Sequence, residues 1–304
     1  MTTTDVEDLG RTTMPGTRSY SFKSRHVAQT FQIDVAMPAV PVPAGRSMPV
    51  IYVTDGNGTF AMAAQIARML QSGPGSFPPV LVVSIGYRFD KARNYTAQYF
   101  ETRTRDFTSI GDPEWMEMSR IALSKQGADV NPVSGGAPAF LAFIQDELKP
   151  FIASRYHVDT IDQTLTGMSL GGFFALHVLF HAPQCFARYV ALSPSLWWGS
   201  GELFRNEASL AARSNDLPVQ LFLGVGREED ADGAPYLAVS NLEKMHTSLL
   251  SRRYPGLRLE HQVFAGETHI SVFPTAFCRA LRSLFGEFSN ASSGVPVASV
   301  RPSS

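Results

Sequence analysis

One serine of the chain stands between glycines in the segment Gly167–Gly172, which reads G-M-S-L-G-G. The run before it, 163–167, is predicted as a strand, and the apolar run 169–181 as a helix. In a G-x-S-x-G motif placed between a strand and a helix, the glycines allow a tight turn that exposes the serine hydroxyl. Ser169 is therefore predicted to be a nucleophile, with the backbone N–H of Leu170 facing a developing oxyanion. The alternative is that these small residues only permit close packing of the helix on the strand.

A serine nucleophile needs a base, and the chain holds seven histidines. His177 and His181 lie on the helix that Ser169 begins, at least two turns further on, so they cannot reach back to the hydroxyl. His269 follows the predicted strand 257–264 through a short loop and precedes a helix. That is the carboxyl edge of the sheet, where open α/β sheets keep their sites. We therefore predict His269 as the base.

The acid of a triad should come from the loop after the predicted strand 218–225. That loop reads G-R-E-E-D-A-D-G and offers Glu228, Glu229, Asp230 and Asp232. At most one of these is expected to turn toward His269 and hold its tautomer. Spacing alone does not choose among them.

A second oxyanion donor is expected from the loop after the predicted strand 50–55, which reads D-G-N-G. A glycine there, Gly56, would let the backbone approach the substrate carbonyl. An ordinary Asp-Gly turn explains the same residues equally well.

Strands and helices alternate along the chain, which predicts an α/β fold with a mostly parallel central sheet and helices on both faces. The first two strands are expected to be antiparallel. The segment 104–137 is predicted to be a long irregular insertion of the kind that forms a lid or a binding loop. We expect one domain over 18–288 with flexible termini, 1–17 and 289–304. The predicted strands are 19–26, 30–38, 50–55, 80–87, 163–167, 187–193, 218–225 and 257–264, and the predicted helices are 61–70, 138–156, 169–181, 236–254 and 270–288.

The bulk composition narrows the function classes. In 304 residues there are 26 basic and 27 acidic side chains, so the net charge of −1 gives no case for nucleic acid or an anionic membrane as partner. The two cysteines share no metal-binding spacing, and neither a metal nor an organic cofactor is expected. The first residues carry acidic side chains and no apolar run typical of a signal peptide, so a cytoplasmic protein is expected. A small-molecule partner is expected, and a homodimer would be unsurprising.

Several segments appear together and in order: YVTDGNGTF, SIGYRFDKARNYTAQYFETRTRDFT, LTGMSLGGFFALHVLFHAP, RYVALSPSLWWG and GETHISVFPTAFCRALRSLF. Over about residues 20–286 the chain resembles the putative esterase family of α/β-hydrolases, in the branch of siderophore esterases and esterase-D-like enzymes. The resemblance implies Ser169 as nucleophile, His269 as base, Leu170 and Gly56 as oxyanion donors, and Glu229 as acid. Some siderophore esterases use a Ser–His dyad, so the resemblance fixes the acid least.

The resemblance also implies substrate-binding candidates. Arg103 begins the family's R-x-x-D-[LF]-T stretch and can face the substrate. A siderophore trilactone would favour a pocket with basic side chains, and Arg103 and Arg105 are candidates for that role. Asn57 lies in the D-G-N-G loop, and Met168 stands where the family often has histidine. Apart from the resemblance, Trp197 and Trp198 are candidates because adjacent residues at a strand end alternate, so that one is expected to point into the core and one toward the pocket. As core residues alone they would need no functional explanation. In the insertion, an apolar lid and simple packing on the body explain three residues equally well: Trp115, Met116 and Met118.

The function predicted is that of a serine carboxylic-ester hydrolase acting through an acyl-enzyme, on a hydrophobic, aryl or siderophore-type ester. One alternative is an acyltransferase that uses the same Ser–His site with an alcohol in place of water. Another is a catalytically silent binding protein on a hydrolase fold.

Overall fold

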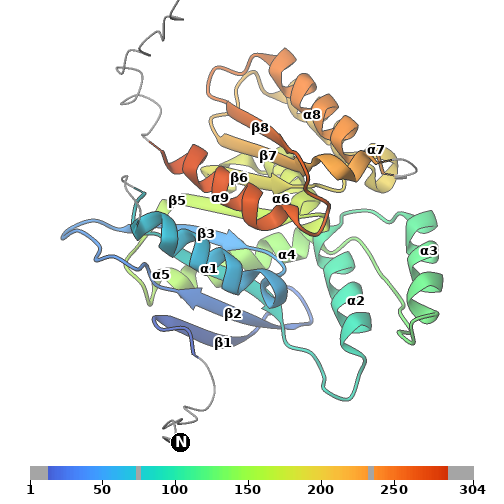
Figure 1. Ribbon diagram of the computed structural model, residues 1–304, viewed down its shortest axis with the longest axis horizontal. Helices are drawn as coiled ribbons and strands as arrows, with labels where there is room; N and C mark the ends of the chain where they lie inside the picture. The colour runs from blue at the N-terminus through green and yellow to red at the C-terminus, as the bar shows by residue number, and fades with distance from the viewer. Residues whose placement is uncertain (1–12, 73–76, 232–235, 287–304) are drawn as a thin grey trace, which may run out of the picture.

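The central feature is one sheet of eight strands in the order β1-β2-β4-β3-β5-β6-β7-β8 (Figure 1). The computed structural model describes residues 13–72, 77–231 and 236–286. The first two strands pair antiparallel with each other and β2 pairs antiparallel with β4, whereas every pair from β4 to β8 is parallel. The predicted mostly parallel sheet is thus confirmed. The strands are β1 (Thr17–Lys23), β2 (Thr30–Ala36), β3 (Met48–Val53), β4 (Leu81–Tyr87), β5 (Val158–Met168), β6 (Arg188–Leu192), β7 (Gln220–Gly226) and β8 (Arg258–Phe264).

Helices cover both faces of this sheet, because successive side chains of a strand point to opposite sides and both sides are apolar. In β3, Ile51 and Val53 pack with α1 (Gly56–Ser72) and α9 (Val272–Phe285). Val50 and Tyr52 face the other cluster, which holds α6 (Leu170–His181) and α8 (Ala238–Arg252). The helical elements along the chain between α6 and α8 are η2 (Pro183–Cys185), α7 (Trp198–Arg213) and η3 (Arg227–Asp230).

The predicted helix 138–156 is interrupted. It consists of α4 (Ala137–Phe143), the π-helical turn η1 (Ile144–Leu148) and α5 (Lys149–Ala153). Pro150 explains the interruption, because it has no N–H to donate to the carbonyl of Asp146 four residues earlier. The wider π turn therefore forms where the ordinary helical hydrogen bond cannot be made.

The prediction of an irregular segment over 104–137 was wrong in part. The segment contains the end of α2 (Tyr95–Phe107) and the whole of α3 (Pro113–Ser124). Asp112 caps α3 by accepting a hydrogen bond from the Trp115 N–H at 3.0 Å, with Pro113 in the first turn. No residue of α3 is buried, and the helix stands at the outer edge of the molecule beside α2 (Figure 1).

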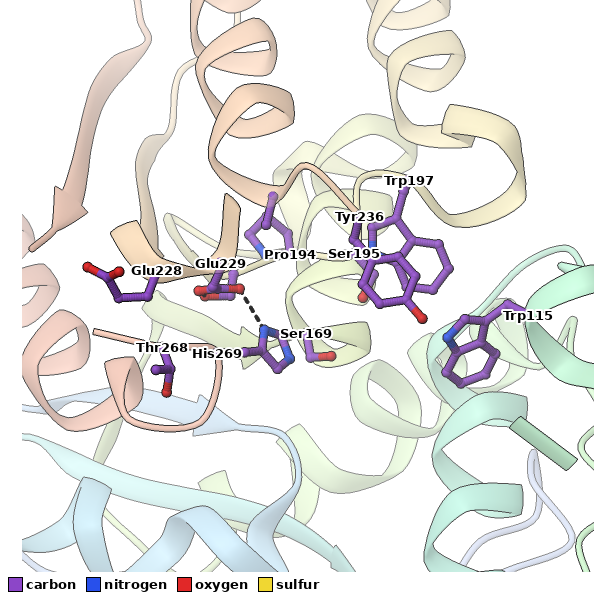
Figure 2. A pocket seen from close by; sticks show the side chains of 12 residues that line it. Trp115, Ser169, Pro194, Ser195, Trp197, Glu228, Glu229, Tyr236, Thr268 and His269 are labelled. Carbon is purple, nitrogen blue, oxygen red and sulfur yellow. Dashed lines mark hydrogen bonds and ion pairs between the residues drawn. The ribbon is translucent and has the colours of Figure 1, made fainter. Parts of the chain in front are cut away.

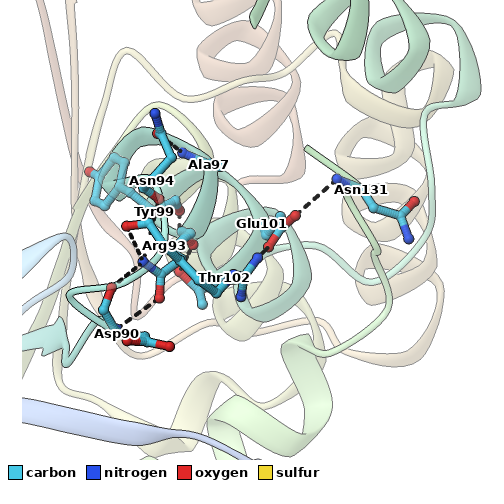
Figure 3. A network of polar contacts seen from close by, with 9 residues as sticks. Asp90, Arg93, Asn94, Ala97, Tyr99, Glu101, Thr102 and Asn131 are labelled. Atoms are coloured by element: carbon cyan, nitrogen blue, oxygen red, sulfur yellow. Dashed lines mark hydrogen bonds and ion pairs between the residues drawn. The ribbon is translucent and has the colours of Figure 1, made fainter. Parts of the chain in front are cut away.

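A polar network joins α2 to the chain that follows α3 (Figure 3). Asn94 caps α2 through the N–H of Ala97 at 3.0 Å. Glu101 accepts one hydrogen bond from Arg93 Nη2 at 2.8 Å and another from the backbone N–H of Asn131 at 2.9 Å. The Asn131 contact ties the chain after α3 back to α2, so α3 is carried on a hairpin whose returning chain is tethered.

The predicted flexible termini fall largely outside the part of the chain that the structure describes, which leaves out 1–12 and 287–304. Within it, Met14 packs against the core cluster on the α1 side, and the Thr17 hydroxyl donates to the Met14 carbonyl at 2.7 Å. Across residues 13–72, 77–231 and 236–286, none of the helices combines the length and apolar character that a membrane crossing requires.

Candidate active site

Ser169 sits at a sharp turn between β5 and α6. Its backbone has φ 59° and ψ −122°, a conformation that residues other than glycine rarely adopt. The turn is held by three backbone hydrogen bonds. The Ser169 N–H donates to Leu192 O at 2.9 Å, and its carbonyl accepts from the N–H groups of Phe173 at 2.9 Å and Ser195 at 3.2 Å. Strain held in this way is typical of functional positions.

The two glycines of the motif are required by space. A Cβ added at Gly167 would lie 2.1 Å from the carbonyl oxygen of Gly171, and one at Gly171 would lie 2.4 Å from Oγ1 of Thr54. Both contacts are far shorter than atoms tolerate, so the turn cannot form with larger residues. The G-x-S-x-G spacing thus follows from the close approach of β5, α6 and the end of β3.

His269 and Glu229 form a hydrogen-bonded pair at the carboxyl end of the sheet. Nδ1 of His269 lies 2.7 Å from Oε2 of Glu229, and since a carboxylate only accepts, Nδ1 carries the proton. The other oxygen, Oε1, accepts from the Ser193 hydroxyl at 2.6 Å and the Gly226 N–H at 2.8 Å. Glu229 lies on the short turn η3 (Arg227–Asp230) after β7. Three donors therefore fix the carboxylate, and Nε2 of His269 is left as an acceptor.

Of the other acids proposed from the sequence, Asp230 is used elsewhere. Its carboxylate accepts from the N–H groups of Val239 and Ser240 at the start of α8. Glu228 is exposed and lines the cavity described next. Asp232 lies outside the described residues.

These side chains open into one cavity of about 450 Å³. Figure 2 shows His269 between Glu229 and Ser169, with Trp115, Trp197 and Tyr236 on the far side of the serine. Residues from several elements therefore line the cavity: the turn between β5 and α6, the loops after β6, β7 and β8, and helix α3. Its lining is Trp115, Ser169, Ser193, Pro194, Ser195, Trp197, Glu228, Glu229, Tyr236, Ala238, Thr268 and His269.

The loop proposed to supply a second oxyanion donor lies beside the turn that holds Ser169. Asp55, with φ 56°, lies in the turn between β3 and α1, and its Oδ2 is 3.3 Å from the position that a Cβ on Gly171 would take. Gly56 begins α1 and is buried. A Cβ on it would meet the Gly86 nitrogen at 2.8 Å. The β3–α1 loop therefore lies against the start of α6, the helix that follows Ser169.

Arg103, proposed from the sequence to face the substrate, is occupied within the protein. Its Nε and Nη2 each lie 3.0 Å from one carboxylate oxygen of Asp55, and Tyr99 OH donates to Oδ1 at 2.8 Å. The Arg103 and Asp55 side chains are 14% and 8% exposed. Burial lowers the pKa of Arg103, but the charge and hydrogen bonds of Asp55, together with Tyr99 and Tyr87, raise it above its usual value, so the guanidinium stays charged. Arg103 is thus placed to orient the β3–α1 loop.

Replacing Arg103 by methionine is expected to lower the free energy of unfolding by about 3–5 kcal/mol, because the Asp55 carboxylate would stay buried without its cation. Urea unfolding measures the change. The matched variant Arg103→Met with Asp55→Asn should regain much of the loss, since asparagine tolerates the positive φ of that position. A loss below about 1 kcal/mol in the single variant would show that the pair contributes little.

Three further candidates proposed from the sequence do not line the cavity. Asn57 accepts from the Tyr87 N–H at 2.7 Å and donates to the Tyr87 carbonyl at 3.0 Å, so its amide fastens the β3–α1 loop to β4. Met168 is partly buried against the α1 side of the core. Trp198 is fully buried, and its Nε1 donates to Ile110 O at 2.9 Å.

In the insertion, Trp115 lines the cavity and Met116 packs partly buried on the core, whereas Met118 is 48% exposed. Sequence reasoning missed Ser193, Tyr236 and Thr268. For Ser193 a signal existed, because it ends the predicted strand 187–193 and begins the S-P-S-L-W-W stretch. Nothing in the sequence distinguished Tyr236 or Thr268 from ordinary loop residues.

His177 lies on α6 away from Ser169, and its environment predicts a pH effect on stability. Burial, and next the neighbouring His181, lower its pKa from 6.5 to about 3, with Nδ1 4.0 Å from Oε1 of Glu202. The unfolded chain then binds the extra proton between these values, so stability is full above about pH 6.5 and is lost as the pH falls. Between about pH 7 and pH 5 the loss should be about 2 kcal/mol. Urea unfolding at both pH values measures it, and His177→Gln should flatten this slope; an unchanged slope would assign it to other groups.

Known proteins resemble this chain in sequence over most of its length. The family model with the description Putative esterase matches residues 106–284. Ferri-bacillibactin esterase BesA of Bacillus subtilis is 32% identical over 275 residues, which are 89% of this chain and 90% of that protein. The chain belongs to the Putative esterase family. It is a carboxylic-ester hydrolase.

Two other proteins are similar to this chain. Siderophore enterobactin esterase of Emericella nidulans is 32% identical over 179 residues, 56% of this chain and 55% of that protein. Among solved structures, the BES protein from Bacillus cereus superposes with a TM-score of 0.75 and 29% identity, over 92% of this chain and 99% of that chain. The predicted α/β-hydrolase fold and ester-hydrolase activity are confirmed.

Proposed function

We propose that the chain hydrolyses siderophore-type esters through an acyl-enzyme on Ser169, with His269 as the base and Glu229 as the residue that orients it. The observation that carries the proposal is the Glu229–His269 hydrogen bond at 2.7 Å in the cavity that also exposes Ser169. It fixes the tautomer in which Nε2 of His269 accepts a proton.

In the first half-reaction, Ser169 Oγ attacks the ester carbonyl while Nε2 of His269 takes the hydroxyl proton. The negative charge moves to the carbonyl oxygen, where the Leu170 N–H and the β3–α1 loop around Gly56 are the proposed donors. The C–O bond to the alcohol then breaks, and His269 returns the proton to the leaving oxygen.

The acyl-enzyme is hydrolysed by the same steps with water in place of Ser169. His269 takes a proton from water, the hydroxide adds to the acyl carbon, and the Ser169 oxygen leaves as it regains its proton. Glu229 stays ionised throughout and stabilises the imidazolium that forms twice in each cycle.

The substrate class rests on the relatives, two of which are named for ferri-bacillibactin and siderophore enterobactin. The test is twofold. A fluorophosphonate should label Ser169 in the purified protein, and a catechol trilactone should be cleaved to its linear products. Labelling without trilactone cleavage would keep the serine mechanism and overturn the substrate class. The absence of labelling in folded protein would overturn the mechanism.

A further inference from the structure

The cavity has an aromatic wall, formed by Trp115, Trp197 and Tyr236. The rings of Trp197 and Tyr236 are stacked, with centroids 4.4 Å apart and planes 23° apart, and the centroids of Trp115 and Trp197 lie 5.8 Å apart. The three residues come from α3, the β6–α7 loop and the loop before α8. Flat rings assembled from three separate segments present a broad apolar surface next to Ser169 (Figure 2).

The wall is held in place from behind. Trp115 stacks on Phe100 of α2 at 5.1 Å and 18°, and Trp198 meets its ring edge-on at 4.9 Å and 67°. Trp198 is itself fully buried. A surface supported by a buried ring can bind a planar group without first being ordered, which lowers the cost of binding.

The charges around the cavity are the second observation. Its lining includes the carboxylates of Glu228 and Glu229, and no lysine or arginine occurs among the lining residues that the structure describes. The two basic candidates of α2 are paired elsewhere: Arg103 with Asp55, and Arg105 with Asp106 at 2.6 and 3.0 Å. A strongly anionic ligand would therefore meet like charge without compensation.

The direction of the reaction assigns the wall to one part of the ester. His269 must return its proton to the leaving alcohol, so the alcohol lies on the His269 side of Ser169. The aromatic wall lies on the other side (Figure 2). The acyl group therefore extends toward Trp115, Trp197 and Tyr236.

We propose that the aromatic wall selects esters whose acyl part carries an uncharged aryl ring, and that the cavity disfavours strongly anionic acyl groups, including anionic metal chelates. This inference rests on the proposed acyl-enzyme mechanism. Among siderophore-type esters it favours the metal-free form over an anionic Fe(III) complex.

The test compares three p-nitrophenyl esters that share one leaving group: 3-phenylpropanoate, 3-cyclohexylpropanoate and 3-(4-sulfophenyl)propanoate. The phenyl ester should exceed the cyclohexyl ester about 5- to 10-fold in kcat/KM, because only a planar ring stacks fully on the wall. It should exceed the sulfophenyl ester by about 10-fold or more. Equal values for all three esters would overturn the proposal.

Two sets of variants separate the effect of the aromatic wall on the aryl preference from the effect of the cavity's charge on anionic esters. Trp197→Leu and Tyr236→Leu should each remove most of the phenyl-over-cyclohexyl preference, and Trp197→Phe should keep it. Tyr95→Leu removes an aromatic ring of α2 that is 54% exposed and outside the cavity lining, and should leave the ratio unchanged. Glu228→Gln should narrow the discrimination against the sulfophenyl ester, and added salt should do the same.

Fluorophosphonate labelling of Ser169 in each variant separates the possible failures. A labelled, folded variant that keeps the wild-type ratio contradicts the role of the wall while the serine mechanism stands. Faster cleavage of a catechol trilactone as its anionic Fe(III) complex than in its metal-free form would overturn the charge argument in the substrate class itself.

Discussion

Replacing Ser169 by alanine is expected to lower kcat for ester hydrolysis by about 10⁴- to 10⁶-fold. The reason is that the covalent route closes, because alanine removes the hydroxyl that the strained turn with φ 59° presents in the cavity beside His269. Initial rates with p-nitrophenyl esters measure the loss, and fluorophosphonate labelling should disappear with it.

The fold should survive this change. The three backbone hydrogen bonds that hold the turn use only the N–H and carbonyl of residue 169, so alanine keeps them. Thermal unfolding of the variant should therefore match that of the natural protein. Ser251→Ala, at an exposed position on α8, serves as the matched control and should retain full activity. Activity in Ser169→Ala within about tenfold of normal would remove Ser169 as the nucleophile.

Replacing Glu229 by glutamine is expected to lower kcat by about 10²- to 10⁴-fold, because every contact of this carboxylate is a hydrogen bond that it accepts. Oε2 accepts from His269 Nδ1, and Oε1 accepts from Ser193 Oγ and the Gly226 N–H. Glutamine has one oxygen and one NH₂ group. If the NH₂ faces His269, the imidazole must take the other tautomer and lose its acceptor Nε2; if it faces Gly226, two donors oppose each other.

The measurement is the pH profile of kcat together with urea unfolding. Loss of activity in a variant that keeps most of its stability would assign Glu229 to holding the tautomer. Glu243→Gln, an exposed carboxylate on α8, is the matched control. A less than about threefold loss in Glu229→Gln would mean that Ser169 and His269 act as a dyad.

Local chemistry allowed some of this site to be predicted from the sequence. The G-x-S-x-G spacing located the turn at Ser169, because glycines are needed wherever backbone atoms approach as closely as they do at Gly167. The position of His269 followed from the rule that parallel strands present their carboxyl ends at one edge. Spacing left four acids open and the resemblance indicated Glu229, but the physical reason needed the structure: on η3, Glu229 meets His269 while Asp230 binds the N–H groups at the start of α8.

Contacts between residues that are far apart in the sequence explain why Arg103 was misjudged. Arg103 was expected to face the substrate, yet it binds Asp55, 48 residues earlier in the chain. Such a partner becomes visible only when the fold brings α2 and the end of β3 together. For α3 the Asp112-Pro113 start was present in the sequence, but a helix without buried residues lacks the apolar periodicity that reveals most helices.

The exposed helix α3 also bears on how this scaffold can diversify. Ser169, Glu229 and His269 follow the ends of β5, β7 and β8. Trp115, in contrast, lies on the hairpin that carries α3, a helix without buried residues. Lengthening, shortening or replacing that hairpin would reshape the acyl side of the cavity and leave the strands that hold the reacting groups in place. Substrate range and catalytic competence can therefore evolve, or be engineered, as separate traits in this protein.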